Sequence, residues 1–156
     1  MGWPCFDFWT FKLNIMAKAA NPTVTPTCTG GVCNPQRTQG LIAQEIANGV
    51  HQLVKLKGPG IFLGFSVSKQ AGANDLTFVD LDIDGRNVVN LSYAAAVNLH
   101  LTQANPSGIA VLGSGSLKTF TFGFPSPLVF KRELVLNVVV NETGVVQIVA
   151  NVVHGS

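Results

Sequence analysis

The sequence predicts an all-β protein: an antiparallel β-sandwich, jelly-roll-like in its connectivity, with an extended N-terminal arm. Three observations predict this class. Apolar and polar residues alternate with a period of two through several short stretches, which gives each stretch one dry and one wet face. Polar turn residues separate the stretches, and roughly eight to ten short strands at that spacing fit a sandwich. Finally, 47% of the residues are hydrophobic and only 12% are charged.

Length and charge limit the organisation of the chain. The 156 residues suffice for one domain with its own core, which we assign to residues 41–156, with residues 1–40 as the arm. The formal net charge of +2 is too small to indicate nucleic-acid binding. No apolar run approaches the length of a membrane span. A chain with so little charge has a largely neutral surface, which is typical of proteins that bury surface against neighbours.

The clearest strand pair is residues 76–92, LTFVDLDIDGRNVVNLS. Its alternating residues are Val79, Leu81 and Ile83 on one side and Asp80, Asp82 and Asp84 on the other. Asp84-Gly85 is a hairpin signal, because Gly tolerates the positive φ of a tight reversal. A strict two-residue loop would mix the two faces, whereas a three-residue loop ending at Gly85 sets Val79 opposite Val89. We therefore expect the three-residue loop.

The same acids also resemble the start of a calcium-binding loop, Asp-x-Asp-x-Asp-Gly. That chemistry needs converging oxygens and a bidentate Glu at the twelfth position, where this chain has Leu91. Strand alternation explains the acids without a metal, and short motifs have many false positives. A solvated strand face is the favoured interpretation, and a metal site made of Asp80, Asp82 and Asp84 stays the alternative.

Residues 41–57 fit two structures. Their apolar residues can be placed on one face of a helix. However, Gly40 and Gly49 weaken a helix, and residues 53–57 alternate as a strand does. We expect two strands that turn at residues 47–49, with a helix as the alternative.

The remaining strands follow from residue 58 onward. The alternation predicts strands at residues 61–67, 94–102, 109–112, 117–124, 134–140 and 146–152. Pro125 and Pro127 should break the chain after residue 124, because proline cannot donate to a strand ladder. The last two strands are partly apolar on both sides, which indicates that another layer or another subunit covers them.

The arm carries both tryptophans of the chain. Its large aromatic residues are Trp3, Phe6, Phe8, Trp9 and Phe11. Their spacing fits neither a helix nor a strand, so we expect them to act as anchors, either in pockets of a neighbouring subunit or on the core of their own domain. Residues 20–40 are rich in Pro, Thr, Gly and Asn and should have little regular structure. Met16 is an alternative start to Met1.

The chain has three cysteines, an odd number that argues against a disulfide framework. Cys28 and Cys33 flank Gly30-Gly31 and could close a small loop as a local disulfide. They could also form half of a zinc site, but no second pair of ligands follows. Reduced thiols are the first expectation, a local disulfide the second and a metal the third.

No constellation of catalytic residues is readable. The sequence lacks Gly-x-Ser-x-Gly, a phosphate-binding loop and His-Glu-x-x-His. Glu133 and Glu142 fall at a strand edge and a turn, which leaves little for a paired-carboxylate glycosidase. Phe120 and its neighbours have only Lys118 beside them, so they look like core rather than a platform for nucleic acid. We expect a protein that is not an enzyme and uses no cofactor.

Three segments carry a resemblance to a family type. They are GPGIFLGFSVSK, LTFVDLDIDGRNVV and GSLKTFTFGFPSPLVFKRELVLNVVV, and together they resemble the small β-sandwich proteins of bacteriophage virions. Those proteins serve as decoration (cement), minor capsid or spike-base subunits. The resemblance covers about residues 58–153 and omits the aromatic N-terminus. It implies a non-catalytic assembly protein located in the virion, with no active-site residue.

Two functions follow as expectations. The first is a virion structural protein that forms homo-oligomers or binds other capsid proteins, without nucleic-acid or membrane partners. The second is a carbohydrate- or surface-binding β-sandwich module, supported by calcium at Asp80, Asp82 and Asp84. Such modules present exposed aromatic rings, and Tyr93 is the only tyrosine, which counts against the second function.

Overall fold

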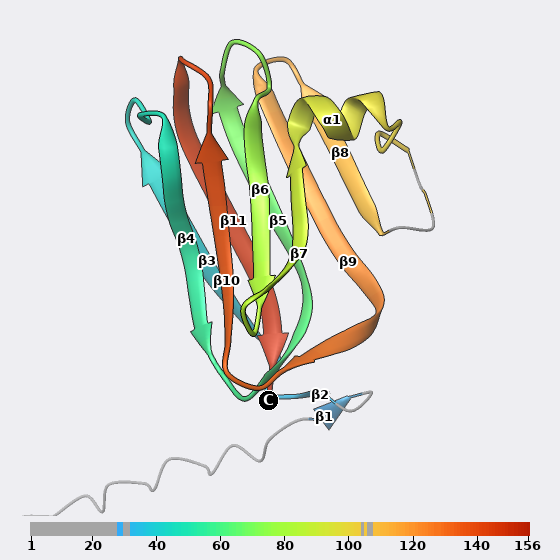
Figure 1. Ribbon diagram of the computed structural model, residues 1–156. Coiled ribbons are helices and arrows are strands. Elements are labelled where there is room, and N and C mark those ends of the chain that lie inside the picture. Colours follow the sequence, from blue (N-terminus) through green and yellow to red (C-terminus); the bar gives the residue numbers. More distant parts are fainter. Residues whose placement is uncertain (1–27, 30–31, 104, 106–107) are drawn as a thin grey trace, which may run out of the picture.

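The computed structural model describes residues 28–29, 32–103, 105 and 108–156, and it confirms the predicted class. Two antiparallel sheets pack face to face (Figure 1). The elements are β1 (Cys28–Thr29), β2 (Val32–Cys33), β3 (Gln36–Ala43), β4 (Gly49–Lys57), β5 (Gly60–Ala71), β6 (Thr77–Ile83), β7 (Arg86–Ser92), α1 (Tyr93–Asn98), β8 (Ile109–Ser114), β9 (Leu117–Phe130), β10 (Glu133–Val140) and β11 (Val145–Gly155).

The strand order is that of a jelly roll. One sheet has the order β4-β10-β6-β7, and the other has the order β3-β11-β5-β9-β8. Four antiparallel pairs, β3/β11, β4/β10, β5/β9 and β6/β7, wrap around the core so that successive pairs alternate between the sheets. Strand β8 adds a fifth member beside β9. This is the connectivity expected for a double-sheet jelly roll. Along the described chain, no helix has the length and hydropathy needed to cross a membrane.

The core lies between the sheets and follows the predicted alternation. Four side chains of β10 are completely buried: Leu134, Leu136, Val138 and Val140. Opposite them, aromatic rings from β5 and β9 pack together, with the rings of Phe65 and Phe120 stacked at 6.1 Å between centroids. Full burial of one such side chain contributes about 1.5–3 kcal/mol, so this interior is the main source of stability.

The predicted three-residue loop of the first hairpin is wrong. Ile83 pairs with Arg86, so the loop contains only Asp84 and Gly85, and both residues have positive φ (54° and 79°), as a tight hairpin turn requires. A β-bulge then shifts the register, so that Leu81 pairs with Val89 instead of Val88. The extra residue returns the apolar side chains to one face, which removes the objection to the short loop.

The strand predicted at residues 94–102 is also wrong, because this segment begins with the helix α1. The Ser92 hydroxyl oxygen accepts a hydrogen bond from the Ala95 N–H at 3.0 Å, which is a typical N-cap. Three alanines follow Tyr93, and alanine has the highest helix propensity. Tyr93 itself is buried and anchors the helix, since its hydroxyl donates to the Val67 carbonyl at 2.7 Å.

Residues 41–57 form two strands as predicted, but the boundary of the arm was placed too late. Strand β3 begins at Gln36, and residues 36–40 pair with β11 in the five-stranded sheet. Gly40 also permits the close approach of β3 to β4 of the other sheet, because a Cβ there would lie 2.3 Å from the Leu53 carbonyl oxygen. Sequence composition alone indicated a turn-rich arm, whereas the pairing with β11 decides the structure of these residues.

Cys33 is disulfide-bonded, which contradicts the first expectation of reduced thiols. Its Cα partner across the β1–β2 ladder is Cys28, the residue named in the second expectation. The Cys33 backbone also exchanges two hydrogen bonds of 2.8 Å with Ser156. The short β1–β2 hairpin is therefore attached to the C-terminal end of the chain.

Irregularities shift three other predicted strands. Pro125 and Pro127 do not end a strand: β9 continues to Phe130, but its pairing with β5 jumps from Gly123 to Leu128, and the strand bends there (Figure 1). A register shift in β5 places Phe62 in the core instead of Ile61 and Leu63. Another shift in β11 buries Val145 and exposes Val146.

Candidate functional site

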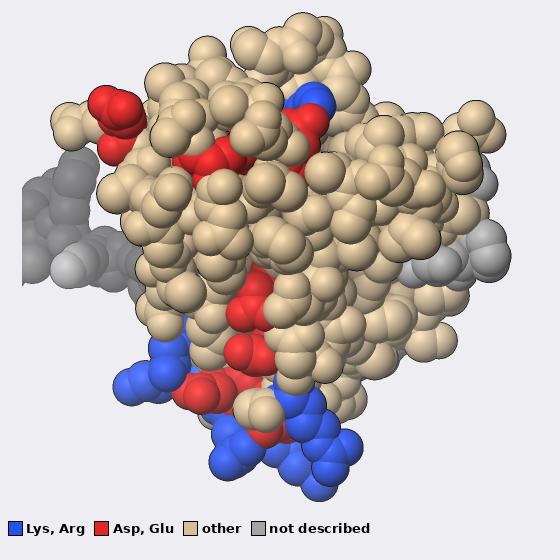
Figure 2. Space-filling model, turned by 45° about the horizontal axis from the view of Figure 1, so that its top comes forward, with Lys and Arg blue, Asp and Glu red and all other residues tan. Residues whose placement is uncertain are grey.

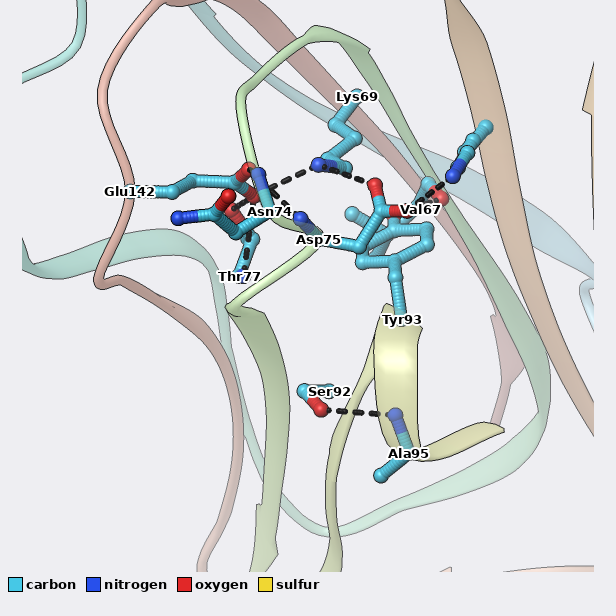
Figure 3. Close-up of polar contacts among 10 residues, drawn as sticks. Val67, Lys69, Asn74, Asp75, Thr77, Ser92, Tyr93, Ala95 and Glu142 are labelled. Atoms are coloured by element: carbon cyan, nitrogen blue, oxygen red, sulfur yellow. Dashed lines mark hydrogen bonds and ion pairs between the residues drawn. The ribbon is translucent and has the colours of Figure 1, made fainter. Parts of the chain in front are cut away.

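A cluster of ionic side chains is buried at one end of the sandwich (Figure 3). Lys69 points inward from β5, and its Nζ lies 2.6 Å from Oε1 of Glu142, in the β10–β11 turn, and 2.9 Å from Oδ1 of Asp75. Lys118 of β9 forms an ion pair with the same Asp75. The cluster joins both sheets and closes the interior at this end.

The Glu142 carboxylate has a complete set of donors. The backbone N–H groups of Asn74, Asp75 and Thr77 donate to it at 3.0, 2.9 and 3.1 Å, and the Thr77 hydroxyl donates at 2.6 Å. Burial acts to raise the pKa of Glu142, but Lys69, Thr77 and the Asn74 N–H outweigh it, so the pKa lies below its ordinary value. The group stays ionised and has structural contacts on both oxygens.

Tyr93 lies beside this cluster but is not available as an acid. Its hydroxyl donates to Val67, and the Lys69 Nζ is 5.4 Å from its ring centroid. Burial raises the pKa of Tyr93 far above its ordinary value, and the charge of Glu142 raises it further. The lysines and carboxylates of the cluster are likewise paired with one another, so the contacts of this cluster stabilise the fold.

The sequence analysis missed this cluster. Lys69 continues the inward series Phe65 and Val67, so a strict alternation would have placed it in the core. Burial of a lysine needs a partner, and that signal could have prompted a search for a carboxylate. Glu142 was assigned to a turn without a structural role, because nothing local to it indicates that three N–H groups converge there.

The three aspartates of the calcium motif are not gathered around a common point. Asp84 accepts backbone hydrogen bonds from Lys131, Arg132 and Glu133 at 2.8, 2.7 and 3.1 Å, and these bonds lower its pKa. Asp80 and Asp82 both accept from the Asn87 side-chain amide. In the parts of the chain that the structure describes, no group of three or more His, Cys, Asp or Glu side chains could hold a metal ion.

We therefore expect calcium to leave the stability of the protein unchanged. A calcium ion that bound the folded state would raise the melting temperature by mass action. The comparison is a thermal unfolding curve in millimolar calcium chloride against one in a chelator, with magnesium chloride at equal ionic strength as the control. A calcium-specific rise in melting temperature that Asp82→Asn abolishes would contradict this assignment.

The outer face of the five-stranded sheet is almost free of charge. The register places cross-strand rows on this face, and a central row consists of Gln39, Asn151, Ser66, Thr121 and Ala110. The next row includes Leu41 and Leu112 at the two edges, which are 58% and 60% exposed. Across β3, β11, β5, β9 and β8, Arg37 is the one charged residue in these outward positions. We call this surface the uncharged face.

The opposite surface has the reverse character. Outward positions of the four-stranded sheet hold most of the charged strand residues, namely Lys55, Lys57, Asp80, Asp82 and Glu133. Figure 2 shows acidic side chains on this side and Lys and Arg gathered at its lower end. The two sheets of the sandwich therefore present different surfaces to solvent, and the difference is one of charge.

The predicted anchors Trp3, Phe6, Phe8, Trp9 and Phe11 lie outside the described residues. Comparison with known proteins adds no assignment: no protein-family model matches the chain, and no curated protein was found that is similar to it.

Proposed function

We propose that this chain is a non-catalytic virion structural protein, a capsid decoration (cement) or minor capsid subunit. It assembles with copies of itself or with other capsid proteins through its N-terminal arm and the uncharged face. The observation that carries the proposal is the near absence of charge on that face, beside an ordinary charged surface on the other sheet.

The chemistry of the face supports burial against a protein. Surfaces designed for solubility carry about 25–35% charged residues, and the centres of protein interfaces are depleted of charge. Five strands about 4.8 Å apart, taken over the eight-residue length of β3, span roughly 630 Å² in the plane of the sheet. That area is of the same order as the roughly 800 Å² per partner of a standard interface.

The contents of the described interior support a structural role. Its buried ionic groups pair with one another, and no described buried side-chain nitrogen or oxygen lacks a hydrogen-bond partner. Jelly rolls are common in viral capsids and also in lectins, so the fold alone does not separate the two functions. The assignment to a virion rests on the resemblance of residues 58–153 together with the uncharged face.

The carbohydrate-binding alternative gains less support. Sugar-binding surfaces use exposed aromatic rings, whose faces are apolar. The outward rows of the uncharged face contain hydroxyl, amide and aliphatic side chains but no aromatic residue. Polar groups on a flat sheet are equally suited to hydrogen bonds across a protein interface.

Ser66→Arg is expected to disrupt assembly. Ser66 lies on β5, the middle strand of the five-stranded sheet, so an arginine there puts a long charged side chain at the centre of the proposed interface. Analytical ultracentrifugation of the full-length chain should show an oligomer for the wild type and a monomer for Ser66→Arg. Gln52→Arg is the control, since Gln52 is exposed on a strand of the other sheet. If both variants assemble as the wild type does, the uncharged face is not the interface.

A further inference from the structure

A groove with a cationic rim lies at the end of the sandwich opposite the buried ionic cluster. Its volume is about 500 Å³, and its lining includes Arg86, Val88, Leu128, Val129, Lys131 and Arg132. We call it the cationic groove. Val129 is 66% exposed, so an apolar side chain of a strand is available to a partner. Val129 also borders a second, largely apolar hollow with Pro59 and Ile61.

Within the described part of the chain, two of the three cationic side chains of this groove have no ion-pair partner. Asp84 also lines it, but three backbone N–H groups occupy the Asp84 carboxylate. Arg132 donates to the Asp84 carbonyl oxygen. Among the described residues, neither Arg86 nor Lys131 forms an ion pair. An apolar floor with free cations at its rim is complementary to a ligand that combines large apolar groups with a carboxylate.

The N-terminal arm contains a segment of that chemistry. Residues 6–9 are Phe-Asp-Phe-Trp, and Asp7 is the only acidic residue that precedes Glu45. A buried aromatic side chain contributes a large apolar contact, and a carboxylate beside arginine or lysine forms a charge-assisted hydrogen bond. The segment and the groove are thus complementary in both respects.

The position of the arm allows it to reach such a groove on a neighbour. The described chain begins at Cys28, in the β1–β2 hairpin, which is hydrogen-bonded to Ser156. Figure 1 shows this hairpin at the same end of the sandwich as the β6–β7 turn, which borders the groove. Residues 10–27 connect this point to the aromatic segment, and 18 residues span at most about 60–65 Å when extended. That reach exceeds the dimensions of a single sheet.

We propose that residues 6–9 of one copy bind in the cationic groove of a second copy. The aromatic side chains contact Leu128, Val129 and Val88, and the Asp7 carboxylate pairs with Lys131 or Arg86. This inference rests on the proposed assembly function and gives its N-terminal arm a docking site. The two contacts can be tested independently, because Ser66 lies in the central row of the uncharged face, whereas Val129 lies near the end of β9, beside the groove.

Single substitutions in the full-length chain test the groove. Val129→Asp places a carboxylate on its floor, and Val50→Asp is the matched control, since Val50 is 68% exposed on β4. Loss of one interface hot spot weakens association roughly 30-fold, and we expect Val129→Asp to show at least that change in sedimentation equilibrium. Val50→Asp should associate as the wild type does. Equal association of the two variants would overturn the proposal.

A mixing experiment separates exchange between copies from docking within one copy. Val129→Asp has an intact arm, and the double variant Phe6→Ala/Trp9→Ala has an intact groove. Each alone should associate weakly, whereas an equimolar mixture should recover a one-to-one complex. If the mixture stays as weak as its components, the arm does not bind the groove of a second copy and the inference fails. If these variants associate normally while Ser66→Arg does not, the inference fails and the proposed function stands.

Reversal of the charges gives a readout specific to the ion pair. Asp7→Lys should weaken association, and Lys131→Glu in the same chain should restore a large part of it. The weakening should also shrink at high salt, because screening removes the contribution of exposed charges. Failure of Lys131→Glu and of Arg86→Glu to rescue Asp7→Lys would contradict the assigned pairing.

Discussion

Replacement of Lys69 by methionine is expected to lower the free energy of unfolding by about 3–5 kcal/mol, the range observed when one partner of a buried ion pair is removed. The Glu142 carboxylate would keep its backbone donors but lose the cation 2.6 Å away. Methionine is close to lysine in length, so the change removes the charge with little change in packing. Urea denaturation followed by circular dichroism measures the effect.

Lys55→Met is the matched control for that experiment. Lys55 and Glu133 are 2.8 Å apart, but their side chains are 43% and 42% exposed, and exposed ion pairs contribute about 0–1 kcal/mol. The free energy of unfolding should therefore change little. If Lys69→Met and Lys55→Met lowered the free energy of unfolding equally, burial of the ionic cluster around Lys69 would not determine its contribution to stability.

The second large effect is a loss of stability in acid. The pKa values of Glu142 and Asp75 lie below their ordinary values of 4.5 and 3.8. For Asp75, burial acts to raise the pKa, but hydrogen bonds and charge from Lys118 and Lys69 lower it more. Both groups bind fewer protons in the folded protein than in the unfolded chain. Their contribution to stability is thus complete above the unfolded pKa values and is lost as the pH falls through the folded ones.

Protonation of these carboxylates leaves the buried Lys69 without its counter-charge. Acid should therefore lower the free energy of unfolding by an amount comparable to the effect of the Lys69→Met substitution. The measurement is the free energy of unfolding in urea from pH 7 down to pH 2.5. In Lys69→Met the slope in acid should be smaller, since the largest cause of the lowered pKa of Glu142 is gone, whereas Lys118 still lowers the pKa of Asp75. An unchanged acid slope in that variant would show that other groups control the pH dependence. Asp82→Asn, a substitution on the outer face of β6, should keep the wild-type profile.

The sequence predicted the sandwich because period-two alternation depends only on which face of a strand is buried. Leu134 to Val140 follow that rule without exception. The predicted structure is wrong where one extra residue in a bulge changes the strand register, or where a helix N-cap overrides the period-two alternation. Val88 in the bulge and Ser92 at the helix N-terminus are such residues. Alternation through Val97, Leu99 and Leu101 resembled a strand, although Ser92 and three alanines favour a helix.

The functional surfaces were less accessible to sequence reasoning. Low charge in the whole chain indicated a neutral surface, but only the strand order shows that the neutral residues share one sheet face. The cationic groove combines β7 with the β9–β10 turn, residues more than 40 positions apart in the chain. Glu142 and Lys69 are separated by 73 positions, so their pairing is likewise a property of the fold. Spacing within a motif carries no information about such distant contacts.

The central claim is that this protein functions as an assembly, and the mass of the full-length chain in solution tests it most directly. Light scattering coupled to size-exclusion chromatography, over a hundredfold range of concentration, should give a defined multiple of the 16.5 kDa chain mass at the upper concentrations. Ser66→Arg should give the monomer mass under the same conditions. A wild-type protein that stays monomeric throughout, in the presence and absence of reducing agent, would contradict self-assembly through the uncharged face and the arm.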